Sequence, residues 1–324
     1  FDRRRQRQMC IRDSVWRTPL LPSAGLSARS GADVHLKLEC WQRTGSFKER
    51  GALTKLASLS SNDLARGVVT ASAGNHGLGV AYASQALGLP PVTVFVPETA
   101  PTSKVRRLLT YGCELHHAGQ DYDACHAIAE AYAQEQGALY LSAYDDPVVI
   151  AGQGTTGLEL IQELPDVEAI LVPVGGGGLI AGLAVVTKTV NPRIHVVGVQ
   201  PEASPAAFLS FRDGRAIETY DAGPTICDGL AGGFGRVPFE LAGDLIDEIL
   251  VVPEADIRQA VAWLAVEEQM VVEGAGAISI APLLNGQFPS RGKKIAAVLT
   301  GRNLDPDVLR AILEEAIQAG GSDG

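Results

Sequence analysis

The stretch AILVPVGGGGLIAGLA at residues 169–184 decides the fold class. Its first six residues form an apolar run typical of a buried strand. Four glycines follow, at Gly175, Gly176, Gly177 and Gly178, and the last six residues continue as an apolar helix. Four glycines between a strand and a helix let backbone N–H groups curl toward one point, as they do around a phosphate. An ordinary turn needs only one or two glycines, so the stretch predicts a phosphate-binding strand-to-helix unit.

The same alternation of short apolar runs and longer helical stretches continues along most of the chain. Consecutive strand–helix–strand units of a parallel sheet require this alternation, so the sequence predicts an α/β fold. No fixed-period repeat or low-complexity linker marks a domain boundary. Strands are expected at residues 34–38, 67–71, 92–96, 168–174, 195–200 and 294–300, and helices at 78–87 and 257–268.

Composition restricts the class of protein. The chain has 324 residues, of which 46% are hydrophobic and 20% charged, which suits a globular enzyme of about two domains. Its formal net charge is -10 and it has no Lys/Arg-rich block, so we expect no nucleic-acid partner. No apolar run approaches the roughly 20 residues that span a bilayer, and the N-terminus lacks the layout of a signal peptide. We therefore expect no membrane partner and a cytoplasmic location.

The cysteines and histidines do not indicate a metal site. The five cysteines are odd in number, widely separated and without the paired spacing of a zinc or redox site, so we expect reduced, mostly buried thiols. The six histidines are equally scattered. Residues 1–14 are rich in Arg and Gln and carry no periodicity that continues beyond them, and we interpret them as a non-native start.

A second segment, TGSFKERGA at residues 44–52, places small and hydroxylated residues before Lys48 at the expected start of a helix. The partial positive charge of a helix N-terminus disfavours the ammonium form of lysine and attracts an anion such as a phosphate. A neutral lysine can form a Schiff base, so Lys48 is a candidate reactive amine. The alternative is an ordinary lysine on a solvated helix face beside Glu49 and Arg50.

A third segment, SAGNHG at residues 72–77, follows an apolar run and precedes a helical stretch. Its small residues let successive backbone amides face inward, which suits a carboxylate. The side chain of Asn75 can donate to a phenolate-like oxygen. The alternative is an ordinary turn with a helix cap.

The glycine run leaves a second class of enzyme open. Gly176, Gly178 and Ala181, with Glu202 further on, also fit the loose dinucleotide fingerprint of a NAD(P)-dependent oxidoreductase. The Lys-Ser/Thr ending of a nucleotide-triphosphate loop is missing. The oxidoreductase interpretation gives no role to the lysine and asparagine segments.

Taken together and in this order, the three segments resemble the fold type II pyridoxal-phosphate enzymes, and within them the threonine/serine dehydratases and serine racemases. The resemblance runs from about residue 17 to residue 305, and the stretches at 149–155 and 299–303 support it. It implies a tryptophan synthase β-like fold of two domains, each with a mostly parallel sheet flanked by helices, and a homodimer. The implied domains are a large cofactor-binding domain of residues 1–55 and 147–324 and a small domain of residues 56–146 that closes over the active site.

By this resemblance, pyridoxal 5'-phosphate is the cofactor, and Lys48 carries it and takes the Cα proton of the substrate. The other implied cofactor-binding residues are Phe47, Asn75 at the phenolic oxygen, Gly175, Gly176, Gly177, Gly178 and Leu179 around the phosphate, and Thr300 at the pyridine nitrogen. The residues implied to hold the substrate carboxylate are Ser72, Ala73, Gly74, Asn75 and His76. A hydroxyl at position 300 does not keep that nitrogen protonated, which lets β-elimination compete.

Departures from the family pattern bear on the reaction. Ala73 stands where serine racemases have the serine that serves the second face of Cα, which favours elimination over racemisation. Gln200 and Ala206 replace the two carboxylates of the family's divalent-cation site, so we expect no metal. Arg302 replaces a frequent second glycine, and Glu273 lacks the usual following Pro.

The expected function is a pyridoxal-phosphate-dependent ammonia-lyase that converts L-threonine, L-serine or both to a 2-oxo acid and ammonia by α,β-elimination. The chain ends soon after the Thr300 segment, which suits a catabolic enzyme without a regulatory domain. The alternatives on the same scaffold are a racemase and a dehydratase of another 3-hydroxy amino acid. The alternatives from other classes are the NAD(P)-dependent oxidoreductase and a non-catalytic binding protein.

Overall fold

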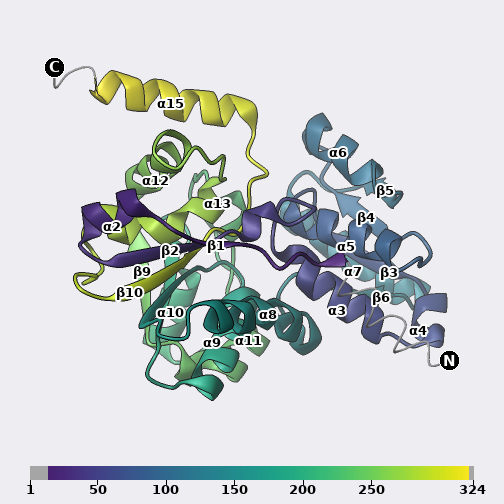
Figure 1. Cartoon of the computed structure of the whole chain (residues 1–324). Helices are drawn as coiled ribbons and strands as arrows, with labels where there is room; N and C mark the ends of the chain where they lie inside the picture. The colour runs from purple at the N-terminus through teal and green to yellow at the C-terminus, as the bar shows by residue number, and fades with distance from the viewer. Residues whose placement is uncertain (1–13, 321–324) are drawn as a thin grey trace. The chain divides into compact units, whose positions relative to one another are not determined.

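The computed structural model describes residues 14–320, and side chains as far as residue 318. Contacts divide the chain into two compact units (Figure 1). Unit 1 comprises residues 1–16 and 42–153, and unit 2 comprises residues 17–41 and 154–324. The interpretation of residues 1–14 as a non-native start lies outside the described residues except for Ser14.

The units differ from the predicted domains chiefly at residues 42–55, which contacts group with the segment that follows them. The reason is the close packing of α3 (Lys48–Ser58) on α5 (Asn75–Ala86). A Cβ added at Gly79 would lie only 3.0 Å from the carbonyl carbon of Lys48, so the absence of a side chain at Gly79 allows the two helices to approach. The division into a large and a small domain around a cofactor stays a prediction.

Unit 2 is built on a six-stranded sheet in the order β1-β2-β10-β7-β8-β9. Neighbouring strands run parallel, except that β1 pairs with β2 antiparallel. Its strands are β1 (Leu20–Pro22), β2 (Asp33–Lys37), β7 (Ala169–Pro173), β8 (His195–Pro201), β9 (Glu248–Val252) and β10 (Lys294–Val298). Every residue of β7 is buried, and burial on both faces explains its continuous apolar sequence.

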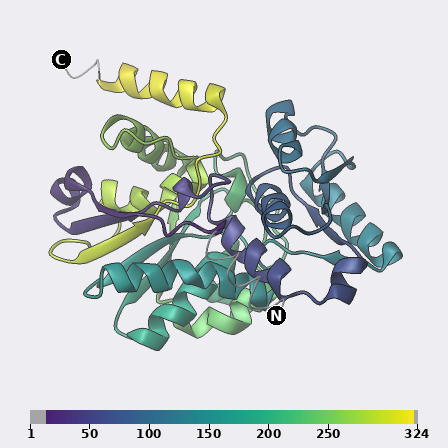
Figure 2. The same cartoon turned by 45° about the vertical axis from the view of Figure 1, so that its right-hand side comes forward.

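The helices of unit 2 are α2 (Ala24–Ser30), α8 (Pro147–Glu163, which begins in unit 1), α9 (Gly178–Val190), α10 (Ala206–Asp213), α11 (Arg236–Ala242), α12 (Glu254–Val266), α13 (Gly274–Ala277), α14 (Ala281–Leu284) and α15 (Pro306–Gly320). Short 3-10 turns lie at Glu39–Trp41, Asp228–Leu230, Gly243–Leu245 and Ile278–Ile280. One sheet face packs against α2, α12 and α14 in a single apolar core. In both views α15 lies alongside α12, where Arg258 makes two hydrogen bonds to Glu315 (Figure 1; Figure 2).

Unit 1 is built on a four-stranded parallel sheet in the order β5-β4-β3-β6. Its strands are β3 (Val68–Ala71), β4 (Thr93–Val96), β5 (Glu114–His117) and β6 (Leu139–Tyr140), and its other helices are α4 (Ser61–Ala65), α6 (Thr102–Leu109) and α7 (Tyr122–Gln136). Two apolar cores cover the two sides of the sheet. One joins α3 and α5 to the strands, and the other joins α7 to residues such as Phe95.

The predicted α/β fold is confirmed, and each of the six predicted strands is present with its ends shifted by at most two residues. The two predicted helices begin three residues earlier than expected, because α5 and α12 each include a polar first turn ahead of the apolar run. Strands β1, β5, β6 and β9 were not among the predicted ones. β5 is half exposed and β6 has two residues, so neither carries a distinct apolar pattern.

The four described cysteines are free and buried, as predicted: Cys40, Cys113, Cys125 and Cys227. Burial raises the pKa of the Cys40 thiol to about 12, and a thiol that stays protonated is a poor nucleophile. Cys10 lies outside the described residues.

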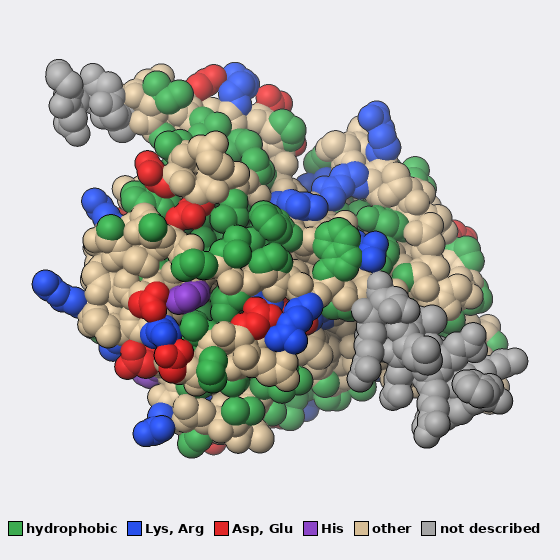
Figure 3. Space-filling view, viewed as in Figure 1, with side chains coloured by type: hydrophobic (Ala, Val, Ile, Leu, Met, Phe, Trp, Pro, Cys, Tyr) green, Lys and Arg blue, Asp and Glu red, His purple; other side chains and the backbone are tan. Residues whose placement is uncertain are grey.

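The surface of unit 2 mixes charges of both signs. On the face seen in Figure 3, basic side chains lie beside acidic ones, and exposed pairs such as Lys294–Asp166 at 2.6 Å are examples of this arrangement. None of the helices in residues 14–320 is both long and apolar enough to cross a membrane.

Candidate functional site

Lys48 is the first residue of α3, as predicted. Its Nζ donates a hydrogen bond to the carbonyl oxygen of Ala143 at 3.4 Å and lies 5.1 Å from the centroid of the Phe47 ring. Ala143 is in the segment that follows β6, 95 residues away in sequence. The amine is half-buried, and a distant backbone carbonyl orients it.

The neighbours of Lys48 do not form a solvated helix face. Glu49 is fully buried, and its Oε2 accepts a hydrogen bond from the backbone N–H of Thr44 at 2.8 Å. Arg50 is 2% exposed and donates to the carbonyl oxygen of Trp16. Glu49 fixes the turn before Lys48 and both charged side chains are buried, so the alternative of an ordinary surface lysine beside Glu49 and Arg50 is wrong.

The asparagine segment forms a tight turn between β3 and α5. The Oγ of Ser72 accepts a hydrogen bond from the N–H of Gly74 at 3.1 Å. A Cβ added at Gly77 would lie 2.1 Å from the carbonyl oxygen of Ser72, so this position must be glycine. No side chain caps α5, which begins at Asn75 after Gly74. The segment is therefore not the ordinary capped turn that we kept as an alternative, and an uncapped helix start suits an anion.

His76 is buried beside Lys48. Its ring is 6% exposed, and its Nε2 lies 3.0 Å from the carbonyl oxygen of Leu141, so Nε2 carries the proton and donates. Burial, and secondly the positive charge of Lys48, lower the pKa of His76 to about 3. The imidazole is therefore neutral at physiological pH. Its Nε2 proton is already used and its unprotonated Nδ1 can only accept, so the predicted contact of His76 with a carboxylate, which stays a prediction, falls to the backbone N–H.

Unit 1 thus brings together Lys48 and the turn at residues 72–77, two of the three predicted segments. Gly79 packs on the backbone of Lys48, and the charge of Lys48 lowers the pKa of His76, so the two segments are close in space. No sequence pattern indicated the part played by Leu141 and Ala143. Their contribution is a backbone carbonyl each, which any residue could supply.

The glycine run forms the predicted strand-to-helix turn between β7 and α9. Gly177 has a φ of 94°, and a Cβ there would lie 2.3 Å from Cε2 of Phe234. A Cβ at Gly175 would lie 3.0 Å from Cα of Leu230. The backbone N–H of Gly235 donates to the carbonyl oxygen of Gly176 at 3.1 Å. The 229–238 segment therefore packs against the turn so closely that side chains are excluded from it.

The turn leads into a helix N-terminus suited to an anion. α9 has 13 residues, begins at Gly178 and has no side-chain cap at Gly177. The first N–H groups of such a helix lack helical partners and carry partial positive charge. Leu179 is 5% exposed and anchors this first turn in the core.

Thr300 and Glu273 belong to a second loop of unit 2. The Oγ1 of Thr300, which is 4% exposed, donates to the carbonyl oxygen of Ala275 at 3.1 Å. The Oε2 of Glu273 accepts from the N–H of Asn303 at 2.9 Å, and the N–H of Glu273 donates to the carbonyl oxygen of Gly301. Glu273 therefore fixes the loop that follows Thr300. Thr300 would have to turn its hydroxyl away from Ala275 to donate to a pyridine nitrogen.

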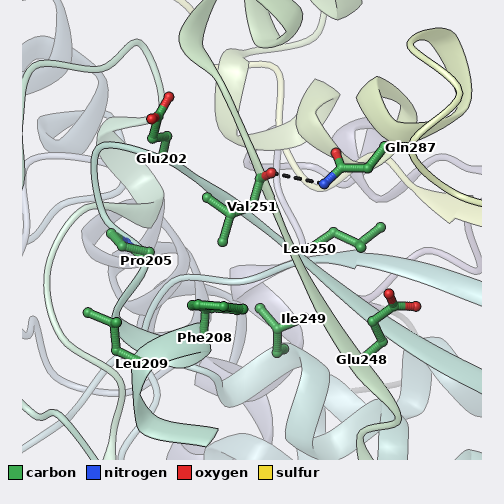
Figure 4. Close-up of a pocket in the computed structure, with 9 residues that line it drawn as sticks. All are labelled: Glu202, Pro205, Phe208, Leu209, Glu248, Ile249, Leu250, Val251 and Gln287. Carbon is green, nitrogen blue, oxygen red and sulfur yellow. Dashed lines mark hydrogen bonds between the residues drawn. The ribbon is translucent and has the colours of Figure 1, made fainter. Parts of the chain in front are cut away.

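A cavity of about 460 Å³ lies elsewhere in unit 2, at the outer edge of β9 (Figure 4). It is lined by Glu202, Pro205, Phe208, Leu209, Glu248, Ile249, Leu250, Val251 and Gln287. None of the predicted cofactor or substrate residues is among them. Glu202, the acid of the alternative dinucleotide fingerprint, is exposed in this cavity.

Among the described residues, no group of three or more His, Cys, Asp or Glu side chains could hold a metal ion. At the positions where the family pattern would have two carboxylates, Gln200 and Ala206 are both fully buried. Arg302, the other departure from the pattern, has an exposed side chain.

Comparison with known proteins places these features in a family. A family model described as "Pyridoxal-phosphate dependent enzyme" matches residues 11–301. An L-threonine ammonia-lyase of Thermotoga maritima is 42% identical over 318 residues, which are 98% of this chain and 79% of that protein.

Solved structures give the same result. The processed form of threonine deaminase isoform 2 from Solanum lycopersicum matches with a TM-score of 0.90 and 33% identity over 97% of this chain and 93% of its own. Maize serine racemase matches with a TM-score of 0.88 and 31% identity over 99% of this chain and 98% of its own. These matches confirm the resemblance and the fold type II architecture. This chain belongs to the family of pyridoxal-phosphate-dependent enzymes.

Proposed function

We propose that this protein is an ammonia-lyase that converts L-threonine, L-serine or both to a 2-oxo acid and ammonia by α,β-elimination. The identity of 42% to an L-threonine ammonia-lyase over nearly the whole chain supports the substrate class. The structural observation that carries the proposal is the placement of Lys48 at the start of α3, with its amine on Ala143 and beside a neutral His76.

We propose that Phe47, Lys48 and Asn75 of unit 1 and Gly175–Gly178, Leu179 and Thr300 of unit 2 bind one pyridoxal 5'-phosphate. The residues fit this group when each unit is considered by itself. Unit 1 offers an amine for an aldehyde. Unit 2 offers an uncapped helix start behind a turn in which Gly175 and Gly177 have no room for a Cβ, and a buried neutral hydroxyl.

When bound, pyridoxal phosphate supplies an electron sink conjugated to the amino group of the substrate. The chain supplies the proton transfers. The amine of Lys48, when free, would accept the Cα proton, and the β-hydroxyl would leave with a proton as water. Hydrolysis of the unsaturated product then consumes one water and releases ammonia and the 2-oxo acid, so that no net water is formed.

The turn at Ser72, Ala73, Gly74, Asn75 and His76 is proposed to hold the carboxylate. Backbone N–H groups at the start of α5 are its donors, which fixes the direction of the Cα–H bond toward the base. Because His76 is neutral and buried, it adds no charge that changes between pH 5 and 9.

Ala73 bears on the choice between elimination and racemisation. Racemisation needs a proton donor on the face of Cα opposite Lys48, and a methyl group cannot donate. The likeness to maize serine racemase therefore speaks for the shared fold more than for its reaction. We propose that racemisation is at most a minor activity.

The test is spectroscopic and chemical. Protein incubated with pyridoxal phosphate should show an absorbance band of a lysine-bound cofactor that Lys48→Ala abolishes and Lys55→Ala, two turns along the same helix, retains. Wild-type protein should release a 2-oxo acid and ammonia in equal amounts from L-threonine or L-serine. A band that survives Lys48→Ala, or the absence of 2-oxo acid from both substrates, would refute the proposal. Chiral analysis of the remaining serine measures racemisation.

A cytoplasmic homodimer is also a proposal. The homodimer is what the sequence resemblance implies, and light scattering of the purified protein measures its mass directly. A single-chain mass at micromolar concentration would contradict it.

A further inference from the structure

We propose that Gln200 is a positioning residue that holds the glycine turn in the shape required by a phosphate. This inference rests on the proposed cofactor site at Gly175–Gly178. Gln200 lies near the end of β8 and its side chain is fully buried. Its position in the sequence lies outside the lysine segment at residues 44–52 and the asparagine segment at residues 72–77.

The amide of Gln200 bridges two backbone segments. Its Nε2 donates to the carbonyl oxygen of Val174 at 3.2 Å, and its Oε1 accepts from the N–H of Phe208 at 3.0 Å. Val174 directly precedes Gly175, and its own N–H donates to the carbonyl oxygen of Val199 at 2.9 Å. Both polar groups of the residue that enters the turn are therefore fixed by β8.

Phe208 is in the first turn of α10, where backbone N–H groups have no helical partner. Its side chain faces the cavity at the edge of β9, near Ile249 (Figure 4). Its backbone N–H donates to the Oε1 of Gln200 instead. One amide thus ties α10 to the strand end that carries the glycine turn.

An amide makes both bonds at any pH. It offers a donor and an acceptor at the end of the same side chain, whereas a carboxylate offers acceptors alone. A carboxylate at position 200 would place an oxygen against the carbonyl oxygen of Val174. Methionine has nearly the same length but forms neither bond.

The rest of the turn is held from the other side. Leu230 and Phe234 pack against Gly175 and Gly177, and Gly235 donates to Gly176. Gln200 supplies the anchor at the upstream end, at Val174. Loss of this anchor should let the N–H groups of the turn drift away from a phosphate while leaving the strand order intact, because supporting contacts set the geometry of binding groups.

The experiment measures the contribution of the phosphate alone. The protein is titrated with pyridoxal 5'-phosphate and with pyridoxal, which lacks the phosphate. The dissociation constant of pyridoxal divided by that of pyridoxal phosphate measures the preference for the phosphate, and this ratio is compared among variants. Gln200→Met should reduce this ratio roughly tenfold, since two buried hydrogen bonds are lost. Ser210→Ala is the matched control, because it removes a buried hydroxyl of α10 that bonds to the carbonyl oxygen of Ala206 and the N–H of Ile217. It should lower the melting temperature but leave the ratio unchanged.

Gln200→Glu keeps the inference testable if the methionine variant fails to fold. A protonated Glu can donate to Val174 and accept from Phe208, whereas an ionised one cannot donate. Burial favours the protonated form, so the ratio relative to wild type should be near 1 at pH 6 and fall at pH 8.5.

The outcomes separate the two proposals. If wild-type protein binds pyridoxal as tightly as pyridoxal phosphate, the proposed cofactor site itself fails. If wild type prefers the phosphate but Gln200→Met and Gln200→Glu keep its full preference at every pH, the positioning role of Gln200 is overturned and the cofactor site stands. A loss of preference in Ser210→Ala equal to that in Gln200→Met would also overturn it.

Discussion

Replacing Gly177 by alanine tests the geometry of the glycine turn. Gly177 has a φ of 94°, where an L-residue pays about 1 to 2 kcal/mol. The added Cβ would lie 2.3 Å from Cε2 of Phe234 and 2.8 Å from Cβ of Pro238, and the repacking this forces costs about 1 to 3 kcal/mol. We therefore expect Gly177→Ala to lower the free energy of unfolding by about 2 to 5 kcal/mol.

Gly214→Ala is the control for the backbone cost. Gly214 follows α10 in the same unit, has a φ of 66° and has nothing within 4 Å of its added Cβ. It should cost only the backbone part, about 1 to 2 kcal/mol. Urea unfolding followed by circular dichroism, without cofactor, gives both values. Equal losses in the two variants would show that Phe234 and Pro238 do not close the turn.

The same variants carry a second readout. A ligand that binds only the folded protein stabilises it by about 2.7 kcal/mol at a concentration 100 times its dissociation constant. We expect pyridoxal phosphate to stabilise Gly214→Ala as it does the wild type and to stabilise Gly177→Ala much less. Equal stabilisation of both variants would refute the placement of the phosphate at this turn.

Two further predictions concern buried titratable side chains, His76 and Lys37. The pKa of His76 is about 3 in the folded protein against about 6.5 unfolded, so between these values the unfolded chain binds more protons, and the free energy of unfolding decreases as the pH falls, by up to about 1.4 kcal/mol per pH unit. Urea unfolding from pH 7 to pH 5 should therefore show a smaller decrease in His76→Gln than in the wild type, and an equal decrease would contradict the buried neutral ring. Lys37 is fully buried and donates to the carbonyl oxygen of Thr18 at 2.7 Å and to Glu159 at 2.8 Å, so Lys37→Met should lower the free energy of unfolding by about 3 kcal/mol. Lys294→Met, at the exposed pair with Asp166, should change it little. Equal effects of the two lysine variants on urea unfolding would contradict the difference in burial.

The features that could be predicted from sequence are those that depend on local backbone. The glycine turn needs residues without a Cβ, and the start of α3 at Lys48 follows from the small residues before it. The strands β7 and β8 are buried on both faces and therefore have nearly continuous apolar sequences, which makes them predictable. Each of these is decided within about ten residues, which is the range that a sequence pattern can encode.

The contacts that could not be predicted join segments far apart in sequence through backbone groups. Lys48 meets Ala143, and His76 meets Leu141, at carbonyl oxygens that carry no side-chain signature. Gln200 was noted only as a missing carboxylate, and its two bonds to Val174 and Phe208 depend on the order of β7, β8 and α10 in space. The strand β5 escaped prediction because its edge position leaves it half exposed.

The N-termini of the helices bear on where an anion can bind. Helices α2, α4 and α7 start with the side chains of Ser23, Ser60 and Asp121 as caps, each worth about 1 kcal/mol. α5 and α9, which begin at candidate residues, have no side-chain cap, and the same is true of α6, α10, α11 and α12. An uncapped start is therefore a condition for anion binding that α5 and α9 meet, and it does not by itself mark an anion site. If the substrate carboxylate and the cofactor phosphate bind there as proposed, they take the place of a cap, and their binding energy includes the stabilisation that the free protein lacks.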